Sequence, residues 1–187
     1  MHKVTLLLAL CALFVLTGCQ KKAPTSDSTP PKLHLSHWEK NQSGGQGAQK
    51  TIYPGGQTEV QHDWIGGSNK ADITVFGDDT EGVTKLEVSG SGMGHCQAGE
   101  GSNAFFAPDP LPVSFPKQTE TVKQGYVKDF LAIHLDALMA NPSCGFHQYG
   151  TDKPLEYFMT TGTWTISAHA ENCCGGKTDG TFTIAVK

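Results

Sequence analysis

Short apolar runs separated by glycine-bearing turns fill the sequence from residue 33 onward, and this pattern restricts the fold more than any other feature. From Thr163 to Ala170 every second residue is apolar, and the segment from Thr181 to Val186 repeats the alternation. Successive side chains of a β-strand point to opposite faces, so each segment is expected to be a strand with one buried face. We therefore predict a mainly β fold.

Two further segments, residues 71–76 and 83–88, alternate in the same way on either side of the polar sequence from Gly77 to Gly82. This arrangement predicts a strand, a turn and a second strand, and the glycines of Ser89-Gly90-Ser91-Gly92 predict another turn. Residues 171–180 are expected to connect the last two strands as a hairpin. Residues 106–116 contain four prolines and predict an extended edge or a loop.

Residues 126–139 fit two patterns. Alternate residues are apolar at the start, as a strand requires, but apolar residues three and four positions apart also fit a helical stripe. We predict a strand for the first part and allow one short helix toward Met139.

Several of these motifs together resemble bacterial immunoglobulin-like sandwich domains. They are the strand D-I-T-V-F, the turn G-D-D-T-E-G, the strand V-T-K-L-E-V-S-G, and the terminal pair G-T-W-T-I-S-A-H-A-E-N with G-T-F-T-I-A-V. The resemblance implies an antiparallel immunoglobulin-like β-sandwich in which Trp164 is the buried tryptophan of a central strand.

The first 18 residues have the pattern of an export signal, with a positive start at Met1-His2-Lys3 and an apolar run over residues 4–16. A helix over that run would span about 20 Å, less than the roughly 30 Å of a bilayer core, so a permanent membrane span is not expected. The run ends in Leu16-Thr17-Gly18-Cys19, which resembles the lipobox of bacterial lipoproteins. The resemblance implies that residues 1–18 are removed and that Cys19 is lipidated and becomes the N-terminus.

The same resemblance implies attachment to a membrane of the bacterial cell envelope through three acyl chains, which hold far more firmly than one. Gln20 follows the cysteine in place of the aspartate that commonly retains such proteins at the inner membrane, so the outer membrane is expected. The following residues are rich in Pro, Ser, Thr and Lys. We therefore predict a flexible tether over residues 19–32 and a folded domain over residues 33–187.

Four cysteines remain in the exported domain once Cys11 leaves with the signal and Cys19 is lipidated. They are Cys96, Cys144, Cys173 and Cys174. An even number outside the cytoplasm suggests disulfides, with three connectivities. We favour Cys96 with Cys144 and Cys173 with Cys174, because adjacent side chains diverge in an extended strand and would need two separate partners converging on one place. The crossed pairings and a free thiol remain alternatives.

The basic residues are all lysine, so the chain lacks the guanidinium group that grips phosphate and guanine edges, and no nucleic-acid partner is expected. The net charge of −4 is spread without long blocks of one sign. The motifs G-x-S-x-G, H-E-x-x-H and C-x-x-C do not occur, nor does a P-loop or a dinucleotide-binding glycine pattern. We expect neither catalysis nor a cofactor.

Three groups of residues are candidate binding sites. The acidic turn from Asp78 to Glu81 lacks the ligand spacing of a helical calcium loop and is expected to be a solvated turn. Side chains suited to copper or zinc are Met93, His95, Cys96, His147 and His169, which only folding could bring together, so no metal site is assigned. Aromatic residues suited to a ligand-binding face, or to the core, are Trp38, Trp64, Phe105 and Phe106.

The sequence therefore predicts a lipid-anchored protein of the cell envelope with a binding or structural role and no catalytic activity. Its expected partners are the membrane, through the N-terminal lipid, and an envelope protein or a glycan. One alternative is a periplasmic lipoprotein that handles copper or zinc, and another is a hydrolase whose site is assembled only by the fold.

Overall fold

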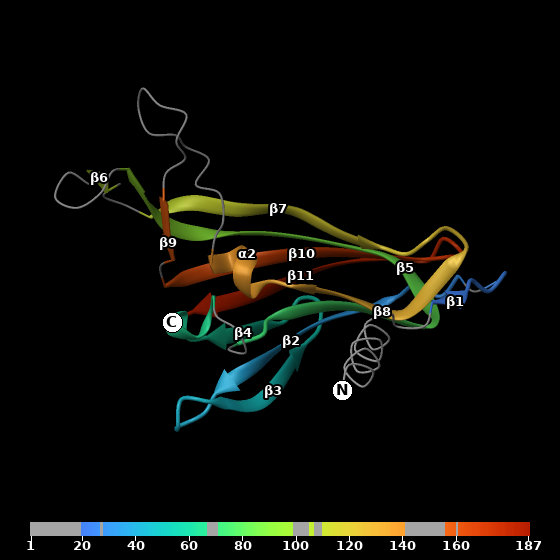
Figure 1. The fold of residues 1–187 in the computed structure, drawn as a ribbon, viewed down its shortest axis with the longest axis horizontal. Helices are drawn as coiled ribbons and strands as arrows, with labels where there is room; N and C mark the ends of the chain where they lie inside the picture. The colour runs from blue at the N-terminus through green and yellow to red at the C-terminus, as the bar shows by residue number, and fades with distance from the viewer. Residues whose placement is uncertain are drawn as a thin grey trace, which may run out of the picture.

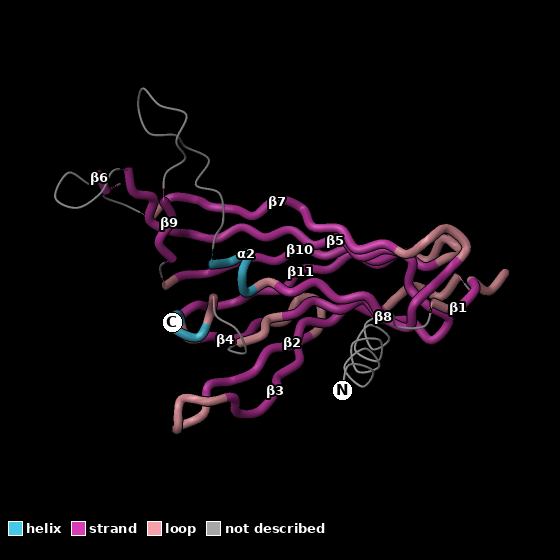
Figure 2. The backbone as a smooth tube through the Cα atoms, viewed as in Figure 1, coloured by secondary structure: helices cyan, strands magenta, loops and turns pink. Residues whose placement is uncertain are grey.

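The computed structural model describes residues 20–26, 28–66, 71–98, 105–106, 110–140, 156–159 and 161–187. Within these ranges eleven strands belong to one hydrogen-bonded sheet, which confirms the mainly β fold (Figures 1 and 2). No helix in the described part is long and apolar enough to cross a membrane.

The first strands are β1 (Lys21–Lys22), β2 (Lys32–Lys40), β3 (Gln46–Ile52), β4 (Gln57–Val60), β5 (Thr74–Ala98) and β6 (Phe105–Phe106). The others are β7 (Leu111–Thr121), β8 (Tyr126–His134), β9 (Glu156–Met159), β10 (Gly162–Asn172) and β11 (Lys177–Val186). A 3-10 turn, η1 (His62–Trp64), and a short helix, α2 (Asp136–Ala140), complete the described elements. Among the described strands, β4 and β11 pair in parallel and the other pairs are antiparallel.

Strand β5 joins two sections of the sheet. Its first part pairs with β2 and β8, and its longer second part pairs with β10 and β7 (Figure 1). The change of partners falls between Asp78 and Val83, where the register with β8 is irregular. Gly82 lies in this interval with φ of +112°, a conformation that favours glycine, and a Cβ there would be 2.4 Å from Val127 Cγ2.

The residues from Gly77 to Gly82, predicted as a turn, are counted within β5, but the chain folds back there. A Cβ on Gly77 would be 3.4 Å from Leu86 Cδ1, whereas nine residues of extended strand span about 30 Å. The two predicted strands do not pair with each other, because each finds partners distant in sequence. The turn predicted at residues 89–92 is wrong, since these residues lie within β5. A Cβ at Gly92 would be 2.4 Å from Trp164 Cδ2, and one at Gly90 would be 2.3 Å from Phe115 Cε1. These glycines give two core rings room to approach the backbone.

The terminal hairpin has the predicted alternation. In the register of β10 and β11, Trp164 lies opposite Ile184 and Ile166 lies opposite Phe182. All four side chains are buried, whereas Thr165 is exposed. The predicted hairpin connection is confirmed but shorter, with residues 173–176 between the two strands.

The segment at residues 126–139 resolves as predicted, with β8 followed by α2. The Asp136 carboxylate, at the start of α2, accepts backbone hydrogen bonds from Asp72 at 2.9 Å and Ile73 at 2.7 Å. These bonds fix the helix beside the start of β5. Met139 then lies fully buried in the core.

The segment predicted as a tether contains β1, which pairs with β8 through Lys21 opposite Val127 and Lys22 opposite Tyr126. Strand β2 begins at Lys32, next to the expected domain start. The tether up to residue 32, the domain boundary and the immunoglobulin-like sandwich stay predictions.

The alternation of the terminal hairpin predicts how single substitutions separate. Trp164→Ala and Phe182→Ala should each lower the free energy of unfolding by about 3 to 5 kcal/mol, because each empties a buried site. Thr165→Ala and Thr183→Ala should each cost about 1 kcal/mol or less. Urea titrations of the four variants measure these losses. Equal losses at both sets of positions would contradict the alternating assignment.

Candidate functional site

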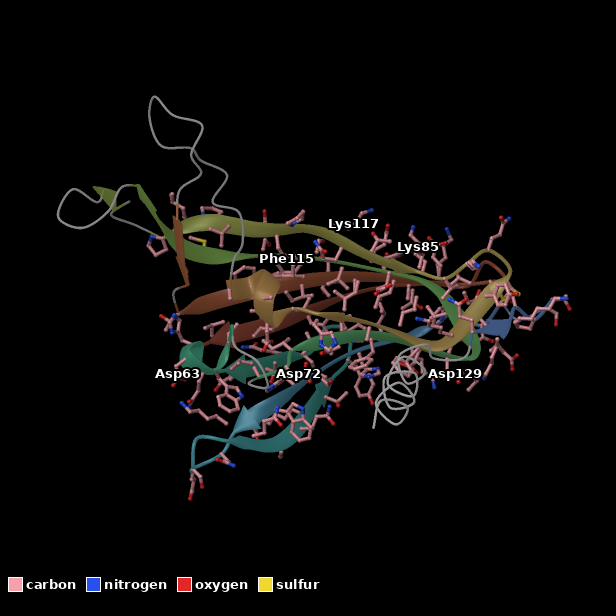
Figure 3. All side chains as sticks on the ribbon, in the orientation of Figure 1. Asp63, Asp72, Lys85, Phe115, Lys117 and Asp129 are labelled. Carbon is pink, nitrogen blue, oxygen red and sulfur yellow. The ribbon has the colours of Figure 1, made fainter. Side chains whose placement is uncertain are left out.

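A cleft of about 300 Å³ lies between β2, β3, β4, η1 and the C-terminal residue. Its lining includes His37, Trp38, Lys50, Glu59, Gln61 and Trp64. Strand β2 supplies one wall, and the turn of η1 supplies the other. Figure 3 labels Asp63 of η1 at this end of the molecule.

Two tryptophans form the aromatic part of the cleft. Trp64 is buried, and its indole Nε1–H donates a hydrogen bond of 2.9 Å to the backbone oxygen of Trp38. The Lys40 Nζ lies 5.9 Å from the centroid of the Trp64 ring, within the range of a cation–π contact. The fold thus brings together two of the aromatic residues that the sequence analysis selected.

The other two aromatic candidates, Phe105 and Phe106, form β6. They pair with Gln97 and Ala98 at the end of β5. Their side chains lie outside the described part of the structure.

The charged groups at the cleft are paired. The ion pairs are Lys40 with Asp63, Lys50 with Glu39, and Lys187 with Glu59. Three cations thus face three anions, so the cleft has no excess charge that would select an anion or a cation. Pairs of this kind exposed to solvent are weak, so a polar ligand can replace one partner at low cost.

His37 is the buried polar group beneath the cleft. Its side chain is 1% exposed, and its Nε2 lies 2.7 Å from Thr58 Oγ1. Its Nδ1 has no hydrogen-bond partner within the described residues. Burial lowers the pKa of His37, and the nearby Lys50 charge lowers it further. The ring is therefore neutral at neutral pH.

The pair of His37 and Thr58 does not form an accessible nucleophile and base. The Thr58 hydroxyl belongs to a residue that is only 5% exposed, so a substrate has no route to it. The hydrogen bond between His37 and Thr58 positions β4 against β2. The groups that reach the cleft are instead indole, amide, ammonium and carboxylate groups. This set can stack on a ring and exchange hydrogen bonds.

The cysteines predicted as disulfides are partly described. Cys173 and Cys174 lie at the tip of the terminal hairpin with their Sγ atoms 3.0 Å apart, and both are thiols. Cys96 lies in β5 with its backbone opposite Tyr157, but its side chain is outside the described part, as are Cys19 and Cys144. The disulfides and the lipidation of Cys19 stay predictions.

The candidate metal ligands do not meet in the described part of the chain, where no group of three or more His, Cys, Asp or Glu side chains could hold a metal ion. His169 places Nδ1 2.8 Å from Asp179 and Nε2 2.8 Å from Glu171, and these two carboxylates raise its pKa. Met93 is partly exposed on β5. The side chains of His95 and Cys96, and all of His147, lie outside the described residues.

The acidic segment from Asp78 to Glu81 lies within β5, and the carboxylates of Asp78 and Asp79 have separate partners. Asp78 accepts from His34 Nδ1 at 2.9 Å, and Asp79 accepts from the Glu81 backbone at 2.9 Å and from Asn172 Nδ2 at 3.3 Å. The segment therefore links β5 to β2 through His34 and to β10 through Asn172.

Sequence reasoning missed His37, although a signal was present. Leu33, Leu35 and His37 alternate along β2, and all three are buried. A histidine in the register of two leucines indicates a buried polar group.

Comparison with family models, with curated proteins and with solved structures gives no match to this chain.

His37 and His169 should make the free energy of unfolding depend on pH in opposite directions. The pKa of His37 is lowered in the folded state, so the unfolded state binds a proton first, and this residue costs stability as the pH falls below about 6.5. The pKa of His169 is raised, so it adds stability that is fully present below about pH 6.5 and is lost as the pH rises through the folded value.

Urea titrations of the wild type, His37→Gln and His169→Gln at about pH 5 and pH 8 test this difference. Relative to the wild type, His37→Gln should gain stability on acidification and His169→Gln should lose it. A change of the same sign in both variants would contradict the two environments.

Proposed function

We propose that this chain is a lipid-anchored protein of the bacterial cell envelope, held in the outer membrane through Cys19, whose domain binds a ligand without catalysis. The sequence Leu-Thr-Gly-Cys supports the anchor. The cleft between β2 and η1 supports the binding role, and the observation that carries it is the half-buried Trp38 on its lining, whose backbone oxygen accepts the hydrogen bond of the Trp64 indole.

The ligand that fits the cleft best is the end of a glycan chain. The cleft volume of about 300 Å³ is at the small end of ligand sites, which suits one or two sugar rings. Trp38 offers a half-buried aromatic surface for the apolar face of a ring, while Lys50, Glu59 and Gln61 offer donors and acceptors for hydroxyl groups. The balanced charges suit an uncharged partner.

The chemistry of the cleft supports binding over reaction. Among the described residues that line it there is no serine or cysteine nucleophile, and its histidine is buried against Thr58. The metal-handling alternative depends on His95, Cys96 and His147, whose side chains lie outside the described part.

The finer fold that we propose is the immunoglobulin-like sandwich, formed by the two sheet sections that β5 joins. Its support is the close approach of these sections. A Cβ on Gly77, in the first part of β5, would be 3.1 Å from Ala170 Cβ of β10, and one on Gly180 of β11 would be 3.3 Å from Leu33 Cδ1 of β2. Trp164 is fully buried, and its ring stacks on that of Phe115.

Titration with soluble gluco-oligosaccharides, with and without N-acetyl groups, tests the binding role by calorimetry and tryptophan fluorescence. Trp38→Ala should weaken binding by roughly tenfold or more, because the stacking surface is lost. Lys50→Gln should weaken it less, because one hydrogen-bonding group changes. Lys117→Gln, on the distant strand β7, is the matched control and should bind as the wild type does (Figure 3).

Two results would contradict the proposal. One is a wild-type chain that binds none of these sugars. The other is binding that Trp38→Ala leaves unchanged while it keeps the native circular dichroism spectrum.

A further inference from the structure

The tip of the terminal hairpin brings two thiols against the N-terminal segment. Cys173 Sγ and Cys174 Sγ lie 3.0 Å apart, and they lie 3.5 Å and 3.4 Å from the backbone oxygen of Pro24. These are distances at which a thiol donates a weak hydrogen bond to a carbonyl oxygen. Both residues are half-buried, and a cavity of about 280 Å³ adjoins Cys173. The two sulfurs thus share one acceptor and can be reached by a reagent.

Asn172 holds this arrangement in place. Its Oδ1 accepts hydrogen bonds from the backbone of Cys174 at 3.0 Å and of Gly176 at 2.8 Å. Its Nδ2 donates to the backbone oxygen of Thr29 at 2.7 Å, and the residue is only 5% exposed. The turn that places the thiols side by side is therefore fixed to the chain that precedes β2.

Residues 20–26, which we call the N-terminal strap, have few other attachments among the described residues. Strand β1 pairs with β8 over two residues, and Ala23 N–H donates to Gly125 O at 3.0 Å. Lys21 also forms an ion pair with Asp129, and both side chains are exposed. A two-residue ladder and an exposed ion pair hold weakly, so the thiol contacts with Pro24 are a substantial part of what keeps the strap docked.

We propose that Cys173 and Cys174 are a reversible oxidation site whose state controls the docking of the strap. In the oxidation, one thiolate attacks the disulfide of an exported oxidoreductase and forms a mixed disulfide with the release of one thiol of the oxidant. The second cysteine then attacks the mixed disulfide and releases the other. The pair loses two electrons and two protons, the oxidant becomes a dithiol, and a Cys173–Cys174 bond forms.

Oxidation removes both S–H donors and brings the sulfurs from 3.0 Å to about 2.05 Å. The oxygen of Pro24 then faces sulfur lone pairs in place of hydrogen-bond donors, so the strap is released. If the chain is anchored as proposed above, a released strap of seven residues extends the reach of the domain from the membrane by roughly 20 Å. This consequence rests on the proposed anchor, whereas the release does not.

Trypsin cleavage after Lys21 and Lys22 measures the release, because both residues belong to β1. The full chain, purified in detergent, is treated with dithiothreitol or with oxidised glutathione before proteolysis. Oxidation should produce a bridged Cys173–Cys174 peptide and speed cleavage at these lysines on the order of fivefold, as the loss of two weak hydrogen bonds implies. Exchange of the Ala23 amide, measured in the wild type, should speed up in parallel.

The matched control is Cys173→Ser combined with Cys174→Ser, in which hydroxyl groups still donate to Pro24 and Cys96 and Cys144 are kept. Its cleavage should be slow and should not respond to the oxidant. Three results would overturn the proposal. They are the absence of a Cys173–Cys174 bridge after oxidation, a bridge that changes neither cleavage nor Ala23 exchange, and an equal oxidant response in the control.

Discussion

The long strand β5 is the constraint on which the described structure depends. It is hydrogen-bonded to β2, β6, β7, β8, β9 and β10, so both sections of the sheet take their position from it. It can serve both because its backbone changes direction near Gly82, where any side chain would collide with Val127. The cleft depends on β5 indirectly, because β2, which forms one wall of the cleft, pairs with the first part of β5. The strap depends on β5 in the same way, because β1 pairs with β8 and β8 pairs with the first part of β5.

Side-chain periodicity made the strands of the terminal hairpin and the sequence of β8 and α2 predictable, because burial on one face leaves a pattern in the sequence. The pairing of β5 was not predictable, because its partners are distant in sequence and glycine-rich segments normally indicate turns. Gly90 and Gly92 have a different reason to be glycine, which is the approach of Phe115 and Trp164. At the cleft, Trp38 and Trp64 were identifiable as aromatic candidates, but the sequence could not predict that they lie next to each other. The composition of residues 19–32 predicts a tether, and the backbone pairing of β1 with β8 within it leaves no compositional signal.

The cleft and the strap lie toward opposite ends of the molecule. Figure 1 shows the C-terminus, whose last residue lines the cleft, far along the long axis from β1. In the proposed anchored state the lipid lies just before the strap, so the cleft faces away from the membrane that holds the chain. This arrangement suits a ligand in the space beyond that membrane, and the cysteine pair at the strap end can alter the distance without touching the cleft.

The lipid anchor is the claim from which this orientation and the cellular setting follow, and the intact mass of the chain isolated from bacterial envelopes tests it most directly. We expect a chain that has lost residues 1–18 and carries acyl groups on Cys19. Cys19→Ala should abolish this mass increase, whereas Cys11→Ala should change nothing. A mature chain without acyl groups on Cys19, or an equal mass increase in the Cys19→Ala variant, would contradict the lipid anchor.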